Sequence, residues 1–146
     1  MPGINMNTQI KVFPHKSLIV LTANGHLDMA ASKAVLKTVA ESSSHSEHAE
    51  VLLDLRETNC SLSISDIYEL ATYMASPNTG LPTHEKIAVL VDGAIEFDHA
   101  KFLALCAVNR GISIRAFDEY DAADDWLKTT LPPDAANDAN NDAKTI

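Results

Sequence analysis

Several kinds of residue are scarce in this chain of 146 residues, and each scarcity excludes a class of protein. Two cysteines, Cys60 and Cys106, are too few for a disulfide framework and lack the paired spacing of a zinc or redox motif. The five glycines form neither of the glycine-rich patterns that hold nucleotide phosphates. The aliphatic runs at 18–21 and 87–91 are far shorter than the ~20 residues that cross a bilayer. We therefore expect no disulfide scaffold, no phosphate-binding loop and no membrane span.

Basic residues are also few. The chain has 11 Lys and Arg against 20 Asp and Glu, a formal charge of −9, and its basic residues are scattered. Binding to nucleic acid or to an anionic membrane needs clustered positive charge, so neither partner is expected. The first residues show no basic segment followed by an apolar run, which predicts no secretory signal. Together with the unpaired cysteines, this favours a cytoplasmic location.

What is present suffices for one domain with a core, since 46% of the residues are hydrophobic and 21% are charged. The hydrophobic period alternates between strand-like and helix-like, which predicts an α/β fold. The predicted strands are 9–13, 17–23, 51–55, 86–91 and 112–117, and the predicted helices are 28–41, 63–76, 97–110 and a last one after 118. We expect a mixed sheet of about five strands with about four helices, opened by an antiparallel hairpin.

Two boundaries in this scheme rest on specific residues. Ser63 and Asp66 have the spacing of a capping box, with Leu62 and Ile67 in staple positions, and Pro77 ends that helix. The C-terminal residues 132–146 are polar and contain no aromatic side chain, which predicts a disordered acidic tail. We therefore expect one domain over residues 1–131. Its first helix is expected to carry an apolar stripe that begins at Leu27.

Several segments resemble a known family. These are TANGHLD after the hairpin, the strand VLLDLR, the strand KIAVLVD and the ending IRAFDEYDAADDWL, of which Phe117-Asp118 followed by Ala123 and Trp126-Leu127 is the most specific part. Over roughly residues 8–130 the chain resembles the SpoIIAA-like family, which is related to the bacterial STAS domains of anti-sigma factor antagonists and to the CRAL-TRIO lipid-transfer fold. The resemblance implies a STAS-like α/β domain. It implies no catalysis, because the family has no established common activity.

The chain departs from the STAS regulators at their phosphorylation site. Those proteins carry a DSSG-like string whose serine is phosphorylated, whereas the stretch from Asp54 here reads DLRETNCSLSISD. Ser63 lies near the phosphoacceptor position, but helix capping already explains it. Phosphorylation of Ser63 is therefore the less favoured interpretation.

Two groups of polar residues were considered as sites. Asp54 and Asp92 follow predicted parallel strands, where open α/β sheets bind ligands, and Arg56 lies close in sequence. These carboxylates would bind a ligand or a cation, share a proton, act as acid and base, or simply cap loops with Arg56 as a neighbour. The string His45 to His48 has helical metal-ligand spacing, but it lies in a polar, loop-like stretch without further ligands, so no metal or cofactor is expected.

A hydrolase is disfavoured for a similar reason. Asp98 and His99 would need Ser61 or Ser65 to complete a catalytic triad, and the GxSxG motif is absent. We therefore do not expect an enzyme.

The predicted helix 97–110 is apolar almost all round. Phe102, Leu105 and Cys106 are expected to project away from the side that packs on the sheet, so a second cover is needed. That cover is another part of the same chain, a second subunit or protein partner, or a small apolar ligand. The favoured hypothesis is a non-enzymatic binding or regulatory module that acts through protein contacts, including a homodimer. The alternative is a carrier of a small apolar or lipid-like ligand, and a hydrolase or metal protein is less favoured.

Overall fold

The computed structural model describes residues 6–13, 17–43, 50–81 and 86–128. The strands of this part are β1 (Met6–Phe13), β2 (Leu18–Leu27), β3 (Glu50–Cys60), β4 (Ile87–Leu90) and β5 (Ile114–Phe117). Its helices are α1 (Met29–Ser43), α2 (Ile64–Ala75), α3 (Ala94–Val108) and α4 (Tyr120–Lys128). The histidine string at 45–48 and the tail at 132–146 lie outside the described residues.

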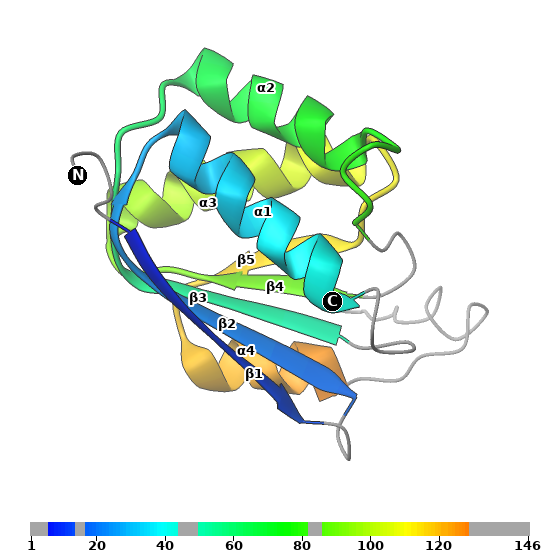
Figure 1. The fold of residues 1–146 in the computed structure, drawn as a ribbon. Coiled ribbons are helices and arrows are strands. Elements are labelled where there is room, and N and C mark those ends of the chain that lie inside the picture. The colour runs from blue at the N-terminus through cyan, green and yellow to red at the C-terminus, as the bar shows by residue number, and fades with distance from the viewer. Residues whose placement is uncertain (1–5, 14–16, 44–49, 82–85, 129–146) are drawn as a thin grey trace, which may run out of the picture.

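The strands form one mixed sheet in the order β1-β2-β3-β4-β5. β1 pairs with β2 antiparallel, and every later pair is parallel. Helices α1, α2 and α3 lie on one face of the sheet, and α4 lies on the other (Figure 1). The predicted α/β architecture with its N-terminal hairpin is confirmed. No helix in the described ranges is long and apolar enough to cross a membrane.

The two faces of the sheet carry separate cores. The larger core lies between the sheet and α1 to α3, and the smaller one packs Phe117, Ala123 and Leu127 against the opposite face. Every residue of β4 is buried, as expected for a central parallel strand that is covered by helices on both sides. The sheet therefore has little free surface near its centre.

β2 and β3 are longer than the sequence patterns indicate. The last residue of β4, Leu90, pairs with Asp54, yet β2 and β3 stay paired to their last residues, Leu27 opposite Cys60. A register shift between Thr22 and Asn24 increases the local bend and twist, and this end of the two strands turns towards the helix layer (Figure 1). The prediction that placed Leu27 on the first helix is wrong, because this side chain ends β2 and is buried there.

α2 begins as predicted. The Ser63 hydroxyl accepts a hydrogen bond from the Asp66 amide at 3.1 Å, and the Ser63 amide donates to Asp66 Oδ2 at 3.0 Å. These two bonds satisfy amides that the first turn leaves without helical partners. α2 packs mainly on α3 and α1, so it forms an outer layer above them (Figure 1).

α3 differs from its prediction in extent and orientation. It begins three residues earlier, after Gly93, which adopts φ 107°, a backbone conformation that residues other than glycine rarely adopt. Cys106 is only 7% exposed and belongs to the larger core, and Phe102 is half-buried against that core. The expectation that Cys106 projects away from the packed side of α3 is wrong, because this side chain is buried in the larger core. α2 packs on α3, so the chain itself supplies part of the cover that α3 needs. Leu105, 59% exposed, does project outward.

Candidate functional site

The predicted carboxylate site contains a closed ion pair. Arg56 Nε donates to Asp54 Oδ1 at 2.9 Å, and the Arg56 terminal nitrogen Nη2 donates to Oδ2 at 2.8 Å. The Arg56 amide also donates to Oδ1 at 3.2 Å. The two side chains lie on the α4 face of β3, and the guanidinium stands 5.9 Å from the centre of the Tyr120 ring. Both oxygens of Asp54 are therefore already engaged.

The ion pair determines the ionisation of both groups. Hydrogen bonding to Arg56 lowers the pKa of Asp54, although partial burial opposes this shift. The pKa of Arg56 is raised, first by its hydrogen bonds to Asp54, with Coulombic contributions from Asp92 and Glu57. Asp92 itself is exposed. The lowered pKa makes Asp54 a poor general base near neutral pH.

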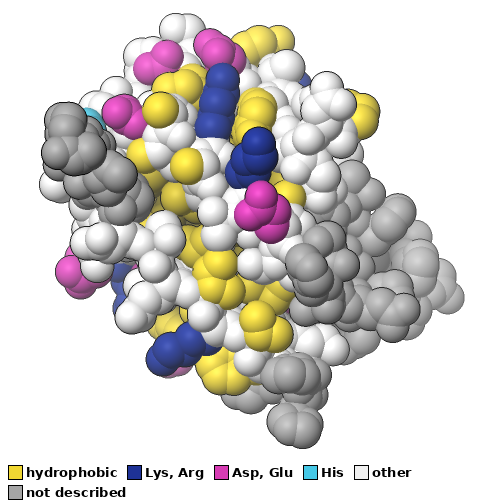
Figure 2. Space-filling view, in the orientation of Figure 1, with side chains coloured by type: hydrophobic (Ala, Val, Ile, Leu, Met, Phe, Trp, Pro, Cys, Tyr) yellow, Lys and Arg dark blue, Asp and Glu magenta, His cyan; other side chains and the backbone are white. Residues whose placement is uncertain are grey.

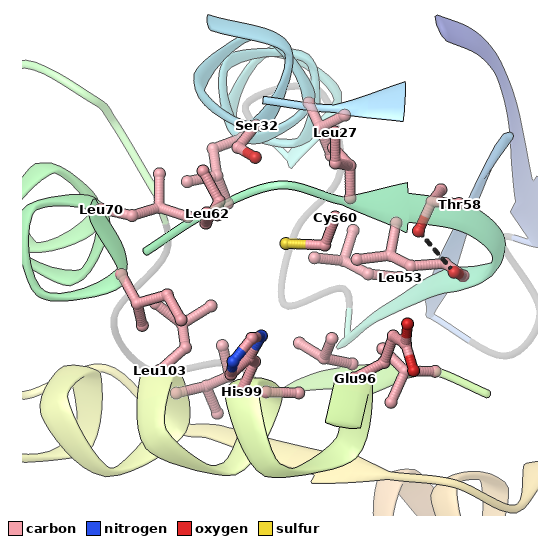
Figure 3. A pocket seen from close by; sticks show the side chains of 18 of the residues that line it. Leu27, Ser32, Leu53, Thr58, Cys60, Leu62, Leu70, Glu96, His99 and Leu103 are labelled. Atoms are coloured by element: carbon pink, nitrogen blue, oxygen red, sulfur yellow. Dashed lines mark hydrogen bonds between the residues drawn. The ribbon is translucent and has the colours of Figure 1, made fainter. Parts of the chain in front are cut away.

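A cavity lies on the opposite face of the sheet. It has a volume of about 90 Å³ and opens between the sheet, α1, α2 and α3; we call it the α2 cavity (Figure 3). Its lining is largely apolar and includes Leu27, Leu36, Leu53, Leu70, Val89 and Leu103. It exists because α2 rests on α1 and α3, so side chains of three helices must span the space above the strands.

Five polar or ionisable side chains also line the α2 cavity: Ser32, Thr58, Cys60, Glu96 and His99 (Figure 3). The Thr58 hydroxyl donates to the Leu55 carbonyl at 2.7 Å. The Ser32 hydroxyl is different: it is on a residue only 6% exposed, and it makes no hydrogen bond within the described part of the chain. A buried hydroxyl without a partner is unusual and calls for an explanation.

Cys60 and His99 do not form an activated nucleophile. Burial raises the pKa of the Cys60 thiol, and the backbone amide of Leu62 only partly opposes the shift. A catalytic thiol needs the reverse, a pKa lowered by a cationic neighbour or a helix N-terminus. Cys60 therefore lacks the lowered pKa that an activated thiol requires.

The hydrolase constellation considered from the sequence is also not assembled. Asp98 pairs with Lys101 at 3.6 Å on the exposed side of α3. Ser61 and Ser65 are exposed, and within the described ranges His99 makes no hydrogen bond to any group. A base held by a carboxylate beside a nucleophile, which such catalysis requires, is not formed by these residues.

Comparison with known proteins agrees with the fold. A sequence model of the SpoIIAA-like family matches residues 18–128, about three quarters of the chain. The chain belongs to the SpoIIAA-like family. No curated protein matches it significantly.

Two solved structures share the fold of this SpoIIAA-like protein. One is an anti-sigma factor antagonist from Mycobacterium paratuberculosis, with a TM-score of 0.55 and 12% identity over 85% of this chain and 95% of the other. The other is an uncharacterised protein with a SpoIIAA-like fold from Shewanella loihica, with a TM-score of 0.52 and 14% identity over 84% and 93% of the two chains. At these identities the likeness concerns the fold.

The SpoIIAA-like chain exposes two apolar pairs on its helical layer. Ile64 and Tyr68 lie one turn apart on α2, and Leu105 and Val108 lie one turn apart on α3; each is at least half exposed. Arg110 links the two helices, since its guanidinium lies 4.6 Å from the centre of the Tyr68 ring. On the face shown in Figure 2, charges of both signs are scattered among hydrophobic side chains, without a large area of one sign.

The sequence patterns located one of these features and missed another. Arg56 was expected as the neighbour of Asp54, and i, i+2 spacing on a strand places both on one face. The α2 cavity was not expected, because its polar residues come from α1, the far end of β3 and α3. The helical spacing of Glu96, His99 and Leu103 was the available signal, since it puts these residues on one side of α3.

Proposed function

We propose that this SpoIIAA-like protein is a non-enzymatic regulatory module that acts by binding another protein through α2 and α3. Its fold resembles that of an anti-sigma factor antagonist from Mycobacterium paratuberculosis. The observation that supports this surface most is the exposure of Leu105 and Val108, which are 59% and 50% accessible and lie one turn apart on α3. Exposed apolar side chains that gather into a patch rimmed by polar residues mark interaction surfaces.

The surface has the composition of an interface rather than of a solvated face. The apolar pairs Ile64 with Tyr68 and Leu105 with Val108 stand beside Arg110, and Tyr and Arg are enriched at binding hot spots. The partner is either a second copy of the chain or a different protein, and both fit a surface of this chemistry.

The test is capture of partners from extract of the source cells, followed by titration of the purified partner. The unaltered chain is compared with the double variant Ile64→Asp and Leu105→Asp, which places charge on both helices. The control is Asp124→Asn, which lies on α4 at the opposite face. We expect a partner that the unaltered and control chains bind equally and that the double variant binds at least about tenfold more weakly. Equal binding by all three chains would contradict the proposed surface.

A second candidate function, binding of a small apolar ligand, is supported by the α2 cavity. Its largely apolar lining and a few convergent polar groups are typical of small-molecule sites. The test is a titration with small apolar compounds monitored by amide NMR, in which shifts confined to cavity residues support the function and no shifts contradict it.

A further inference from the structure

The α2 cavity combines two features that each cost stability. The side chains around a void lose dispersion contacts that a filled core would provide. The Ser32 hydroxyl, 6% exposed on α1 and lining the same cavity, has lost water without gaining a hydrogen bond from the described residues. One bound molecule with an apolar body and a hydrogen-bonding atom would relieve both costs.

We propose that the α2 cavity binds a small uncharged amphiphile, such as a short alcohol or ketone, whose oxygen forms a hydrogen bond with the Ser32 hydroxyl. This assignment rests on the second proposed function and adds the chemical class of its ligand. Ser32 distinguishes such a molecule from a plain hydrocarbon, which would fill the space but leave the hydroxyl without a partner.

The lining disfavours an anionic ligand. None of the described residues that line the cavity is Lys or Arg, so an anionic headgroup would find no opposite charge there. Glu96, at the start of α3, would repel an anion. Burying an unpaired charge costs far more than burying a hydroxyl, so fatty-acid carboxylates are poor candidates for the enclosed part.

The volume sets the size of the enclosed group. A dry engineered cavity of about 150 Å³ holds benzene. The α2 cavity, about 90 Å³, is smaller. On that scale it encloses about four non-hydrogen atoms, and a longer molecule would extend through the opening.

Water is a weaker occupant of the same space. A buried water needs two to four polar partners, whereas the Thr58 hydroxyl already uses its proton in the bond to the Leu55 carbonyl and can only accept. Figure 3 shows Ser32 on the α1 side of the cavity and His99 on the α3 side, with apolar side chains around them. His99 is half-buried.

The experiment compares 1-butanol with n-pentane, which has the same number of non-hydrogen atoms but no hydroxyl. Binding to the full chain is measured from amide NMR shifts of the cavity residues, with Ser32→Ala as the test variant and Ser65→Ala, an exposed serine of α2, as the control. We expect Ser32→Ala to weaken the binding of 1-butanol, relative to that of n-pentane, by about threefold to tenfold. This is the range that the loss of one neutral hydrogen bond gives. Ser65→Ala should leave the ratio unchanged.

The outcomes separate the two levels of the proposal. If both probes bind and the ratio is the same in Ser32→Ala, the cavity is a ligand site but the role of Ser32 is wrong. If neither probe shifts the cavity residues, the second proposed function fails as well. Ala100→Leu, which adds volume to the lining, should abolish binding of both probes; unchanged binding in this variant would place the ligand elsewhere and overturn the proposal.

Discussion

Leu27 and Cys60 are paired across the last residues of β2 and β3, beyond the end of β4. Both side chains line the α2 cavity, so this continued pairing builds one of its walls. The same extension places the Cys60 thiol in an apolar setting, and it separates the cavity from the Asp54 and Arg56 ion pair on the other face. The two sites should therefore respond independently to substitution.

The ion pair on the α4 face predicts a pH-dependent stability. Because the pKa of Asp54 is lowered in the folded state, its contribution is present above the unfolded-state pKa of about 4 and is lost as pH falls through the folded value. Asp54→Asn should lower the free energy of unfolding near neutral pH by about 1 kcal/mol, because Asp54 is 14% exposed but Arg56 is 43% exposed and screened. Urea unfolding at several pH values measures this.

The control for that variant is Asp98→Asn, which alters an exposed pair with Lys101. Its effect should stay within about 0.5 kcal/mol at every pH. A difference between Asp54→Asn and the unaltered chain that persists unchanged in strong acid would show that the ion pair is not its source.

Replacing Ser63 and Ser32 with alanine, one at a time, should change the free energy of unfolding in different ways. Ser63→Ala removes the N-cap of α2 and should lower the free energy of unfolding by about 1 kcal/mol. Ser32→Ala removes a buried hydroxyl without a partner among the described residues, so stability should stay the same or rise by up to about 1 kcal/mol. Thermal and urea unfolding of both variants test the pair; a large loss in Ser32→Ala would mean that this hydroxyl is already satisfied.

Cys60 should react slowly with alkylating reagents. Burial raises the pKa of the thiol, and only the thiolate is the nucleophile, so the rate should increase mainly above about pH 9. Cys106, which is more deeply buried, should react more slowly still. The pH profile of iodoacetamide labelling, measured site by site by mass spectrometry, tests this; a midpoint for Cys60 below about pH 8 would contradict the burial.

Leu105 and Cys106 are neighbours on α3, but replacing them with Asp should affect stability differently. Leu105→Asp should leave the free energy of unfolding within about 0.5 kcal/mol, because the side chain is already exposed, while weakening any self-association. Cys106→Asp should unfold the chain, because it buries an unpaired charge in the larger core. Light scattering over a range of concentrations and circular dichroism distinguish these effects. If the unaltered chain remains monomeric at high concentration, the partner of this surface is a different protein and not a second copy.

Local signals explain which parts of the fold were predictable. The capping box at Ser63 and the buried runs of β3 and β4 are encoded by neighbouring residues, so those elements were identified correctly. The far end of β3 reads RETNC, which lacks a clear apolar alternation, and its strand conformation depends on pairing with β2. The exposure of Cys106 was misjudged because the position of α2 above α3 is a tertiary feature that helical periodicity does not contain.

The binding surface can be located by hydrogen exchange on the complex between the full chain and its purified partner. The proposed function predicts slower amide exchange in α2 and in α3, residues 64–75 and 94–108, with exchange in β1 and α4 unchanged. Protection confined to β1 or to α4, with α2 and α3 exchanging as in the free chain, would contradict it.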